Sequence, residues 1–471
     1  MVDDRDAQPQ EPPSADDFDD AGEVAVEDRH RRLRIAVVLT LVAAIVVFGA
    51  VGGRIMTSRE TPAPSPRLPA RIAVIGSNGS LATMDGRGGS SVNYAAPDVA
   101  FSFPTWSPDG TRIAALGNTG SESAVYVFAA RADGTAAAPE PAVLYRSAGA
   151  PPFYLYWAPD SQKVAFLAQE ADAISLQVAP ADASAKPAIV RRGAPLYWEW
   201  VDPSRVIAHV GLDGSDAFLG EVGLDGTATE PKGLTPGLFR APAIGGDGAI
   251  RAYVGSSADG LDQVVVESRD QTSHHEVSVF GFTALNFDPA GRTLAFVAAD
   301  RPGLNTSGLP IGPLRVVDPA TGEARTLLDG RVLAFFWAPD GKTIAALRIP
   351  DPGDGVASDG SNATLAVARP GPTATAPPPE AEGIDLNLAF VDVASGNARS
   401  ARSVHLAQTF VYQLLPYFDQ YALSHRVWAP DSSSIALPLA SDSAATGIFS
   451  IPSDGSEPQR IADGELGFWS P

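Results

Sequence analysis

From residue 71 to the end of the chain, hydrophobic residues occur in short alternating runs, separated by turns rich in Pro, Asp and Gly. This pattern is typical of β-strands joined by tight turns. One turn recurs as W-[SA]-P-D-[GS], with an aliphatic residue seven positions after the tryptophan. The near-identical copies begin at Trp106, Trp157, Trp337 and Trp428, and their aspartates are Asp109, Asp160, Asp340 and Asp431. Weaker copies contain Trp200 and Phe287, and a fragment begins at Trp469.

The recurring unit is predicted to be a hairpin whose first strand ends in a large aromatic residue. Proline fixes φ at about −65° and favours the second position of a β-turn, which Asp and Gly then complete. Aromatic side chains dominate core burial, so each tryptophan is expected to be a packing wedge between neighbouring units rather than a ligand platform. Self-similarity at a spacing of about 40–50 residues indicates a repeat architecture.

A second hairpin accompanies each unit, and eight such hairpins can be counted between residues 81 and 461. The domain begins at Arg71–Val74 with no strand before it, whereas Leu466–Trp469 is a strand end with nothing after it. The two ends are predicted to complete one blade, because a ring closed in this way leaves no open sheet edge. The expected fold is all-β, an eight-bladed β-propeller over residues 71–471. Seven blades are the alternative, because the unit near residues 240–277 is the least regular.

A 19-residue run without charge, Ile35–Gly53, precedes this domain. As a helix it would extend about 28 Å, close to the hydrocarbon thickness of a bilayer. Four arginines stand just before the run, which places the N-terminus in the cytoplasm. We therefore expect an acidic cytoplasmic tail with a basic end (1–34), a transmembrane helix (35–53), a Pro-rich linker (54–70) and an extracytoplasmic propeller (71–471). A cleaved secretory signal is the alternative, and the long acidic leader argues against it.

The repeat resembles the TolB-type propeller repeat, also called PD40 or WD40-like. The resemblance rests on the four copies of W-[SA]-P-D-[GS]-x-x-[IV]-A and covers the whole domain after residue 70. It implies a membrane-bound interaction module of the bacterial cell envelope that binds a protein, a peptide or a cell-wall component. It does not imply the same partner, because an anchor stands here in place of the N-terminal domain that normally accompanies the TolB propeller.

The sequence lacks the usual signatures of catalysis. No G-x-S-x-G nucleophile elbow is present, so the peptidase half of a prolyl oligopeptidase is missing. His274-His275-Glu276 lacks the H-E-x-x-H spacing, and we place it in a hairpin turn. His209, His405 and His425 are isolated, which favours structural or surface roles. We expect a non-catalytic protein; the alternatives are a propeller hydrolase or lyase with acidic channel residues, and an envelope ligand sensor that signals through the cytoplasmic tail.

Composition narrows the range of ligands. The net charge is −21 and the pI about 4.6, which argues against a nucleic-acid partner, because phosphate backbones need a basic face. The chain has no cysteine and therefore no disulfide, thiol nucleophile or Cys-ligated metal. No cofactor is expected. Acidic residues such as Asp351 and Asp354 leave a structural calcium ion open, although their spacing matches no EF-hand loop.

Three insertions interrupt the repeat, at residues 300–313, 349–386 and 407–424. Alternate connections of a four-stranded blade lie on opposite faces, so all three are expected on the face opposite the W-[SA]-P-D-[GS] turns. The third insertion is rich in aromatic residues, for which two alternatives stand. They form an exposed partner-binding patch, or they pack down as a lid on the propeller rim. These residues are Phe410, Tyr412, Tyr417, Phe418 and Tyr421.

Overall fold

The computed structural model describes residues 69–132, 139–211, 217–229, 237–238, 240–257, 259–301, 309–350, 384–441 and 444–471. The chain divides into two units, Met1–Ser65 and Pro66–Pro471, and every described residue belongs to the second. The expected tail (1–34), transmembrane helix (35–53) and most of the linker (54–70) lie outside the described residues. In the described part, no helical segment has the length and hydrophobicity that a membrane span needs.

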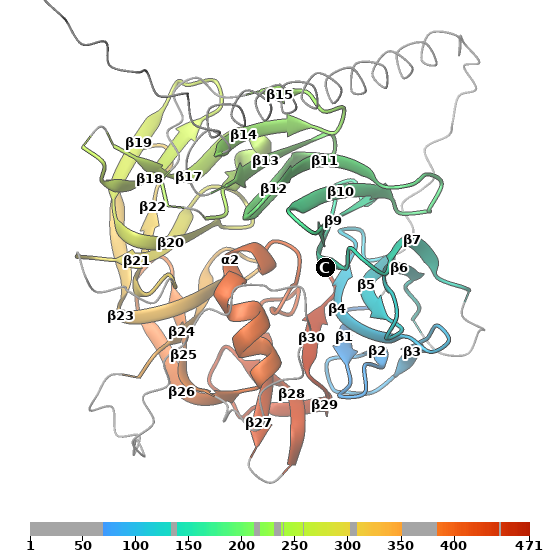
Figure 1. Ribbon diagram of the computed structural model, residues 1–471. Coiled ribbons are helices and arrows are strands. Elements are labelled where there is room, and N and C mark those ends of the chain that lie inside the picture. Colours follow the sequence, from blue (N-terminus) through green and yellow to red (C-terminus); the bar gives the residue numbers. More distant parts are fainter. Residues whose placement is uncertain are drawn as a thin grey trace, which may run out of the picture. The chain divides into compact units, whose positions relative to one another are not determined.

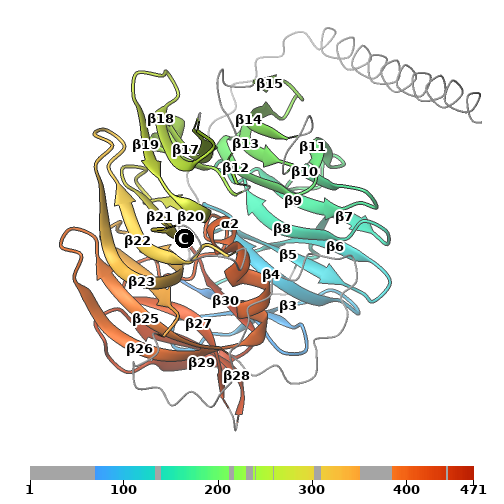
Figure 2. The same ribbon diagram turned by 60° about the vertical axis from the view of Figure 1, so that its left-hand side comes forward.

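The second unit is a ring of antiparallel blades around a central channel (Figure 1). In each blade one strand lies toward the centre and the fourth lies outside, as Figure 2 shows for β4 and β7. From the centre outward, blade 1 consists of β30 (Leu466–Trp469), β1 (Ile72–Ile75), β2 (Leu81–Met84) and β3 (Val92–Tyr94). Blade 2 consists of β4 (Ala100–Trp106), β5 (Arg112–Asn118), β6 (Ser123–Ala129) and β7 (Ala142–Ser147), and blade 3 of β8 (Pro152–Trp157), β9 (Lys163–Gln169), β10 (Ile174–Pro180) and β11 (Ala188–Gly193). Blade 4 consists of β12 (Leu196–Asp202), β13 (Arg205–Val210), β14 (Phe218–Gly223) and β15 (Ala228–Thr229).

The remaining blades follow in chain order, with a short 3-10 turn, η3 (Gly246–Gly248), in blade 5. Blade 5 consists of β16 (Ala243–Gly245), β17 (Ile250–Ser256), β18 (Asp262–Ser268) and β19 (His274–Ser278). Blade 6 consists of β20 (Phe280–Phe287), β21 (Leu294–Ala299), β22 (Gly312–Val317) and the first part of β23 (Ala324–Trp337), and blade 7 of the last part of β23, β24 (Thr343–Arg348), β25 (Ile384–Asp392) and β26 (Ala398–Leu406). Blade 8 contains β27 (Ser434–Ser441), β28 (Ala444–Pro452) and β29 (Gln459–Asp463).

Among the described residues the propeller has eight blades, as expected, and the alternative of seven is wrong. Hydrogen bonding joins the strands into five separate four-stranded sheets and one ten-stranded sheet. The ten-stranded sheet contains blades 6 to 8, because β23 pairs with both β22 and β24, and β26 of blade 7 pairs with β27 of blade 8. In blade 8, an isolated β-bridge between Trp428 and Ile435 takes the place of the inner strand.

The predicted closure of the ring is confirmed. Strand β30 pairs with β1, with Ile72 opposite Trp469 and Ile75 opposite Leu466. The last strand of the propeller is therefore the inner strand of blade 1. Because successive strands of a blade run in opposite directions, their connections alternate between two faces. We call the face with the first-to-second and third-to-fourth connections the turn face, and the opposite face the insertion face.

Four of the repeat tryptophans link neighbouring blades. The indole Nε1 of Trp157 in blade 3 donates a hydrogen bond to the carbonyl oxygen of Thr105 in blade 2, at 3.0 Å. An equivalent bond to the preceding blade is made by three other tryptophans: Trp106 to Phe468, Trp337 to Asn286 and Trp428 to Phe336. The repeat tryptophans thus hold neighbouring blades together. The repeat aspartates cap their own turns: Asp109, for example, accepts a hydrogen bond from the N–H of Thr111 at 3.0 Å.

Candidate functional site

Residues 407–425, which join β26 to blade 8, enter the centre of the ring, and we call them the channel segment. They form a π-helical turn, η4 (Phe410–Leu414), a 3-10 turn, η5 (Leu415–Tyr417), and a single turn of α-helix, α2 (Phe418–Tyr421). Figures 1 and 2 both show α2 among the inner strands. This insertion therefore occupies the channel instead of covering its rim.

Gln420 fixes α2 to the inner strands of blades 3 and 4. Its side-chain oxygen accepts a hydrogen bond from the N–H of Trp198 at 3.0 Å, and its Nε2 donates to the carbonyl oxygen of Trp198 at 2.6 Å. The hydroxyl of Tyr154 donates to the carbonyl oxygen of Gln420 at 2.7 Å. The Gln420 amide thus pairs with both the backbone N–H and the carbonyl oxygen of Trp198, as the backbone of a neighbouring strand would. These bonds hold the segment against the inner strands.

A buried ion pair fixes the other side of α2. Arg240 Nε lies 2.9 Å from Asp419 Oδ2, and its Nη2 donates to Asp419 Oδ1 at 3.0 Å. Both side chains are buried. Burial raises the pKa of the Asp419 carboxyl, and the Arg240 guanidinium opposes this shift. Asn286 of blade 6 donates to the carbonyl oxygen of Asp419 at 3.1 Å. Buried charges persist in proteins when they are paired and hydrogen-bonded, as this pair is.

The five aromatic residues of the segment do not form an exposed patch. Phe410, Phe418 and Tyr421 are buried, with Phe418 0% exposed, and Tyr417 is half-buried. Tyr412 alone among the five is an exposed side chain, at 47%. Of the two alternatives drawn from the sequence, packing is the one observed, and it goes deeper than a lid on the rim. A ring of eight blades leaves a wide centre, and protein interiors are close-packed.

The aromatic rings of the segment contact two blades that are not neighbours in the ring, blades 7 and 2. Phe418 lies edge-on to Phe335 of blade 7, with 5.3 Å between ring centroids, and Tyr421 stacks on Phe103 of blade 2 at 5.2 Å. His425 closes the segment: its Nδ1 lies 2.6 Å from the Ser424 hydroxyl, and burial lowers its pKa to about 3. The segment therefore bridges the ring through apolar contacts as well as polar ones.

One titratable carboxyl faces the channel beside the segment. The residue that precedes each wedge position points inward, as Thr105 and Asn286 show by bonding to the segment. Glu199 has this position in blade 4, and Tyr156 has it in blade 3. Burial raises the pKa of Glu199 to about 8, against a hydrogen bond that its Oε2 accepts from the N–H of Ile244 at 2.7 Å. Burial also raises the pKa of Tyr156, and Glu199 raises it further.

The joint between blades 4 and 5 lacks the aromatic wedge. Gly245 stands at the wedge position of blade 5, and a Cβ there would lie 2.8 Å from the ring of Phe287 in blade 6. In the described residues, blades 4 and 5 share one small apolar cluster, Leu219, Tyr253 and Val265. The cluster between blades 2 and 3, by contrast, has eleven buried residues, Trp157 among them. The eroded repeat near residues 240–277 therefore has a structural counterpart in a weakly apolar joint.

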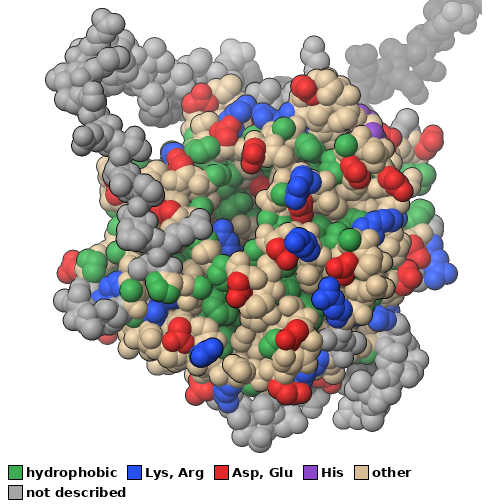
Figure 3. Space-filling model, turned by 180° about the vertical axis from the view of Figure 1, so that it is seen from behind, with side chains coloured by type: hydrophobic (Ala, Val, Ile, Leu, Met, Phe, Trp, Pro, Cys, Tyr) green, Lys and Arg blue, Asp and Glu red, His purple; other side chains and the backbone are tan. Residues whose placement is uncertain are grey.

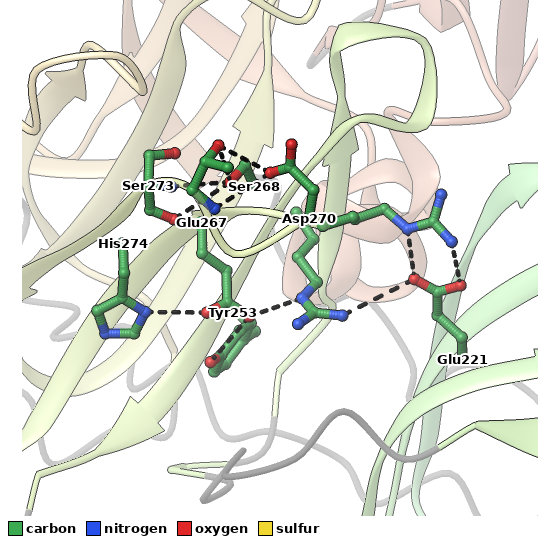
Figure 4. A network of polar contacts seen from close by, with 10 residues as sticks. Glu221, Tyr253, Glu267, Ser268, Asp270, Ser273 and His274 are labelled. Carbon is green, nitrogen blue, oxygen red and sulfur yellow. Dashed lines mark hydrogen bonds and ion pairs between the residues drawn. The ribbon is translucent and has the colours of Figure 1, made fainter.

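Charged side chains occupy this joint (Figure 4). Glu221 of blade 4 accepts two hydrogen bonds from Arg269 of blade 5, both at 2.6 Å. Arg251 donates from Nε to Glu267 at 2.6 Å, and its Nη1 lies 3.8 Å from Glu221. Arg205 Nη1 approaches Glu221 at 3.6 Å. Two buried carboxylates thus share three guanidinium groups, so the network is paired throughout.

A histidine ends the network at the outer strand β19. His274 Nδ1 lies 2.9 Å from Glu267, and its Nε2 lies 3.0 Å from Glu276. Hydrogen bonds to Glu276 and Glu267 raise its pKa. The expected hairpin turn at His274-His275-Glu276 is wrong, because these residues belong to a strand that pairs with β18. His209 is buried, with its pKa lowered to about 4 by burial, and His405 contacts Asp385 at 2.9 Å.

Two further features of the described residues concern possible ligands: groups of metal-binding side chains and the distribution of surface charge. Among the described residues, no group of three or more His, Asp or Glu side chains is placed to hold a metal ion. Asp351 and Asp354, considered for calcium, lie outside the described residues. Figure 3 shows Asp and Glu interspersed with Lys and Arg across one face, with hydrophobic surface in recesses between them.

Sequence reasoning missed the joint residues and the anchoring residues of the channel segment. Two signals point to the joint: Glu199 is a carboxyl between two tryptophans of a strand, and Gly245 replaces an aromatic residue. Nothing local marks Gln420 or Arg240, because their partners are far away in the sequence.

No family model and no curated protein matches this chain. Solved structures that are similar to it include TolB from Acinetobacter baumannii, with 13% identity over 88% of this chain and 89% of that one, at a TM-score of 0.37. An oligogalacturonate lyase in complex with manganese has 11% identity over 84% of this chain and 85% of its own, at 0.42. The β-propeller domain of the Trilobed protease from Pyrococcus furiosus has 11% identity over 71% and 93%, at 0.40. The bound manganese and the enzymatic activities are properties of those proteins.

Proposed function

We propose that this chain is a non-catalytic interaction module, tethered to the cell membrane, whose extracytoplasmic propeller binds a protein, a peptide or a cell-wall component. The observation that carries the proposal is the channel segment. Its α2 turn and aromatic side chains fill the space between the inner strands, where a propeller enzyme would need room for a substrate. We therefore assign partner binding to the outer surface of the propeller.

The insertion face is the surface that we assign to the partner. The first described strand starts at the turn face, where the N–H of Ser470 donates to the carbonyl oxygen of Arg71 at 2.7 Å. The chain therefore enters the described propeller on the turn face, and the insertions of the repeat belong to connections on the opposite face. Three of the exposed large hydrophobic side chains belong to connections on that face: Leu238, Leu261 and Tyr412. Exposed apolar side chains of this kind favour protein contacts.

Capture of partners from cells tests this proposal. The full chain carries an affinity tag, is crosslinked in intact cells and is purified from mild detergent. Replacing Leu238, Leu261 and Tyr412 together by serine is expected to abolish the captured species at unchanged protein level. The matched control replaces Val143 and Ile189, exposed hydrophobic residues on the outer strands β7 and β11, by serine, and it is expected to capture normally. Equal capture by both variants would overturn the choice of face.

A second candidate is a hydrolase or lyase that uses the channel. It is favoured by Glu199, whose carboxyl faces the channel with its pKa raised to about 8, close to the value that suits a general acid or base at neutral pH. The same capture experiment separates the two candidates. A partner that is retained by Glu199→Gln and lost with the serine variant supports the interaction module; the reverse outcome supports a channel site.

A further inference from the structure

We propose that the joint between blades 4 and 5 is the seam at which the propeller ring opens, and that opening increases as the pH rises from 6 to 8. This inference concerns the ring itself and does not depend on the proposed function. It starts from the composition of the joints. Four of the other joints contain a tryptophan wedge bonded to the preceding blade, whereas this one has Gly245, a three-residue apolar cluster and a charged network.

The bonds that cross the seam are mostly made by carboxylates of blade 4. On the channel side, Glu199 accepts from the N–H of Ile244 at 2.7 Å. Further out, Glu221 accepts from Arg269 and approaches Arg251. A hydrophobic joint loses stability only when apolar surface is exposed, which hardly depends on pH. A joint built on carboxylates depends on the protonation of each one, so this seam differs in kind from its neighbours.

Glu199 sets the direction of the pH dependence. In the closed joint its pKa is about 8, because it is buried and its bonded partner is an uncharged N–H. In an open joint water would return the carboxyl to about 4.3. The closed state therefore binds one more proton between these two values, and rising pH favours the open state by up to tenfold per unit in that interval.

The other groups that face the seam do not reverse this direction. His274 has a raised pKa, but it is bonded to Glu276 and Glu267 of its own blade, so these bonds remain when the seam opens. The guanidinium groups remain charged in this range. The buried hydroxyl of Tyr253 and the buried ring of His209 remain neutral. The guanidinium groups are those of Arg205, Arg240, Arg251 and Arg269, and the carboxylates paired with them are Glu221, Glu267 and, for Arg240, Asp419.

The absence of cysteine from the chain allows a direct test. One cysteine is placed in the seam by Leu219→Cys, and a control cysteine is placed in the joint between blades 2 and 3 by Val125→Cys; both positions are buried. Labelling by a maleimide is timed on the full chain at pH 6, 7, 8 and 9. Each rate is divided by the rate for the same variant in denaturant at the same pH, which removes the ionisation of the thiol.

The normalised rate at Leu219→Cys is expected to rise at least about tenfold between pH 6 and 8, while the rate at Val125→Cys stays level. Adding Glu199→Gln, which keeps an acceptor for Ile244 but cannot ionise, is expected to remove most of the rise. Val265→Cys, on the blade 5 side, repeats the measurement if Leu219→Cys does not fold. Equal rises at both joints, or a rise that Glu199→Gln leaves intact, would overturn the proposal.

Discussion

Ser161 and Asp109 link the turns of neighbouring blades: the N–H of Asp109 donates a hydrogen bond to the Ser161 hydroxyl oxygen at 3.1 Å. Ser432 receives the equivalent bond from Asp340, also at 3.1 Å. Serine thus replaces glycine at the last position of the turn motif where the side chain can reach the preceding blade. Ser161 nevertheless has φ of 60°, a left-handed conformation in which a side chain is strained.

Substitutions at Ser161 should separate the hydrogen bond from the strain. Ser161→Ala loses the bond and keeps the strain, so the free energy of unfolding should fall by about 1–2 kcal/mol. Ser161→Gly loses the same bond but relieves the strain, and its stability should lie within about 0.5 kcal/mol of the parent. Urea denaturation measures both variants. If alanine is tolerated as well as glycine, the left-handed conformation of Ser161 is not strained, because both variants lose the same bond.

The wedge at Trp157 should be costly to remove. Its side chain is 2% exposed and packs in the apolar cluster between blades 2 and 3, so Trp157→Ala should lower the free energy of unfolding by about 3–5 kcal/mol. Trp337 makes the same type of hydrogen bond, but its ring is only half-buried. Trp337→Ala should therefore cost about half as much. Equal losses would show that the hydrogen bond, rather than burial, dominates the wedge.

The ion pair of the channel segment should be sensitive to the loss of one partner. Asp419→Asn leaves the buried Arg240 guanidinium without a countercharge, so the free energy of unfolding should fall by about 3–5 kcal/mol. Replacing both residues, by Arg240→Met with Asp419→Leu, should recover most of this loss. The exposed pair of Arg460 and Asp463 is the control, and Asp463→Asn should change stability by less than about 0.5 kcal/mol. A double variant as unstable as Asp419→Asn would contradict the electrostatic explanation.

The ring was predictable because its signals are local and repeated. The turn motif places a wedge and a hairpin in most blades, and the isolated fragment at Trp469 indicates how the ring closes. The eighth blade followed from counting hairpins. Blade 5 looked irregular in sequence for a physical reason that the structure supplies: its joint relies on charged groups, which do not follow the alternation of apolar residues.

The channel segment was not predictable to the same degree, because its environment is assembled from residues far apart in the sequence. Phe418 meets Phe335, and Tyr421 meets Phe103, only after the ring has formed. An aromatic-rich insertion has the same composition whether it covers a surface or fills a channel. Gln420 shows the limit most clearly, since its partner Trp198 is 222 residues away.

Acid should destabilise the turn face through the aspartates that cap its turns. Partial burial raises the pKa of Asp202, but hydrogen bonds from Ser204 and Arg205 outweigh this and lower it to about 2. A carboxyl with a lowered pKa stabilises the fold above about pH 4, and this contribution is lost as the pH falls towards 2. Allowing for partial exposure, Asp202 should contribute about 1 kcal/mol at pH 7. Asp202→Asn should therefore be less stable than the parent at pH 7 and equally stable at pH 2 in urea denaturation, and a difference that persisted at pH 2 would assign the effect to packing rather than to charge.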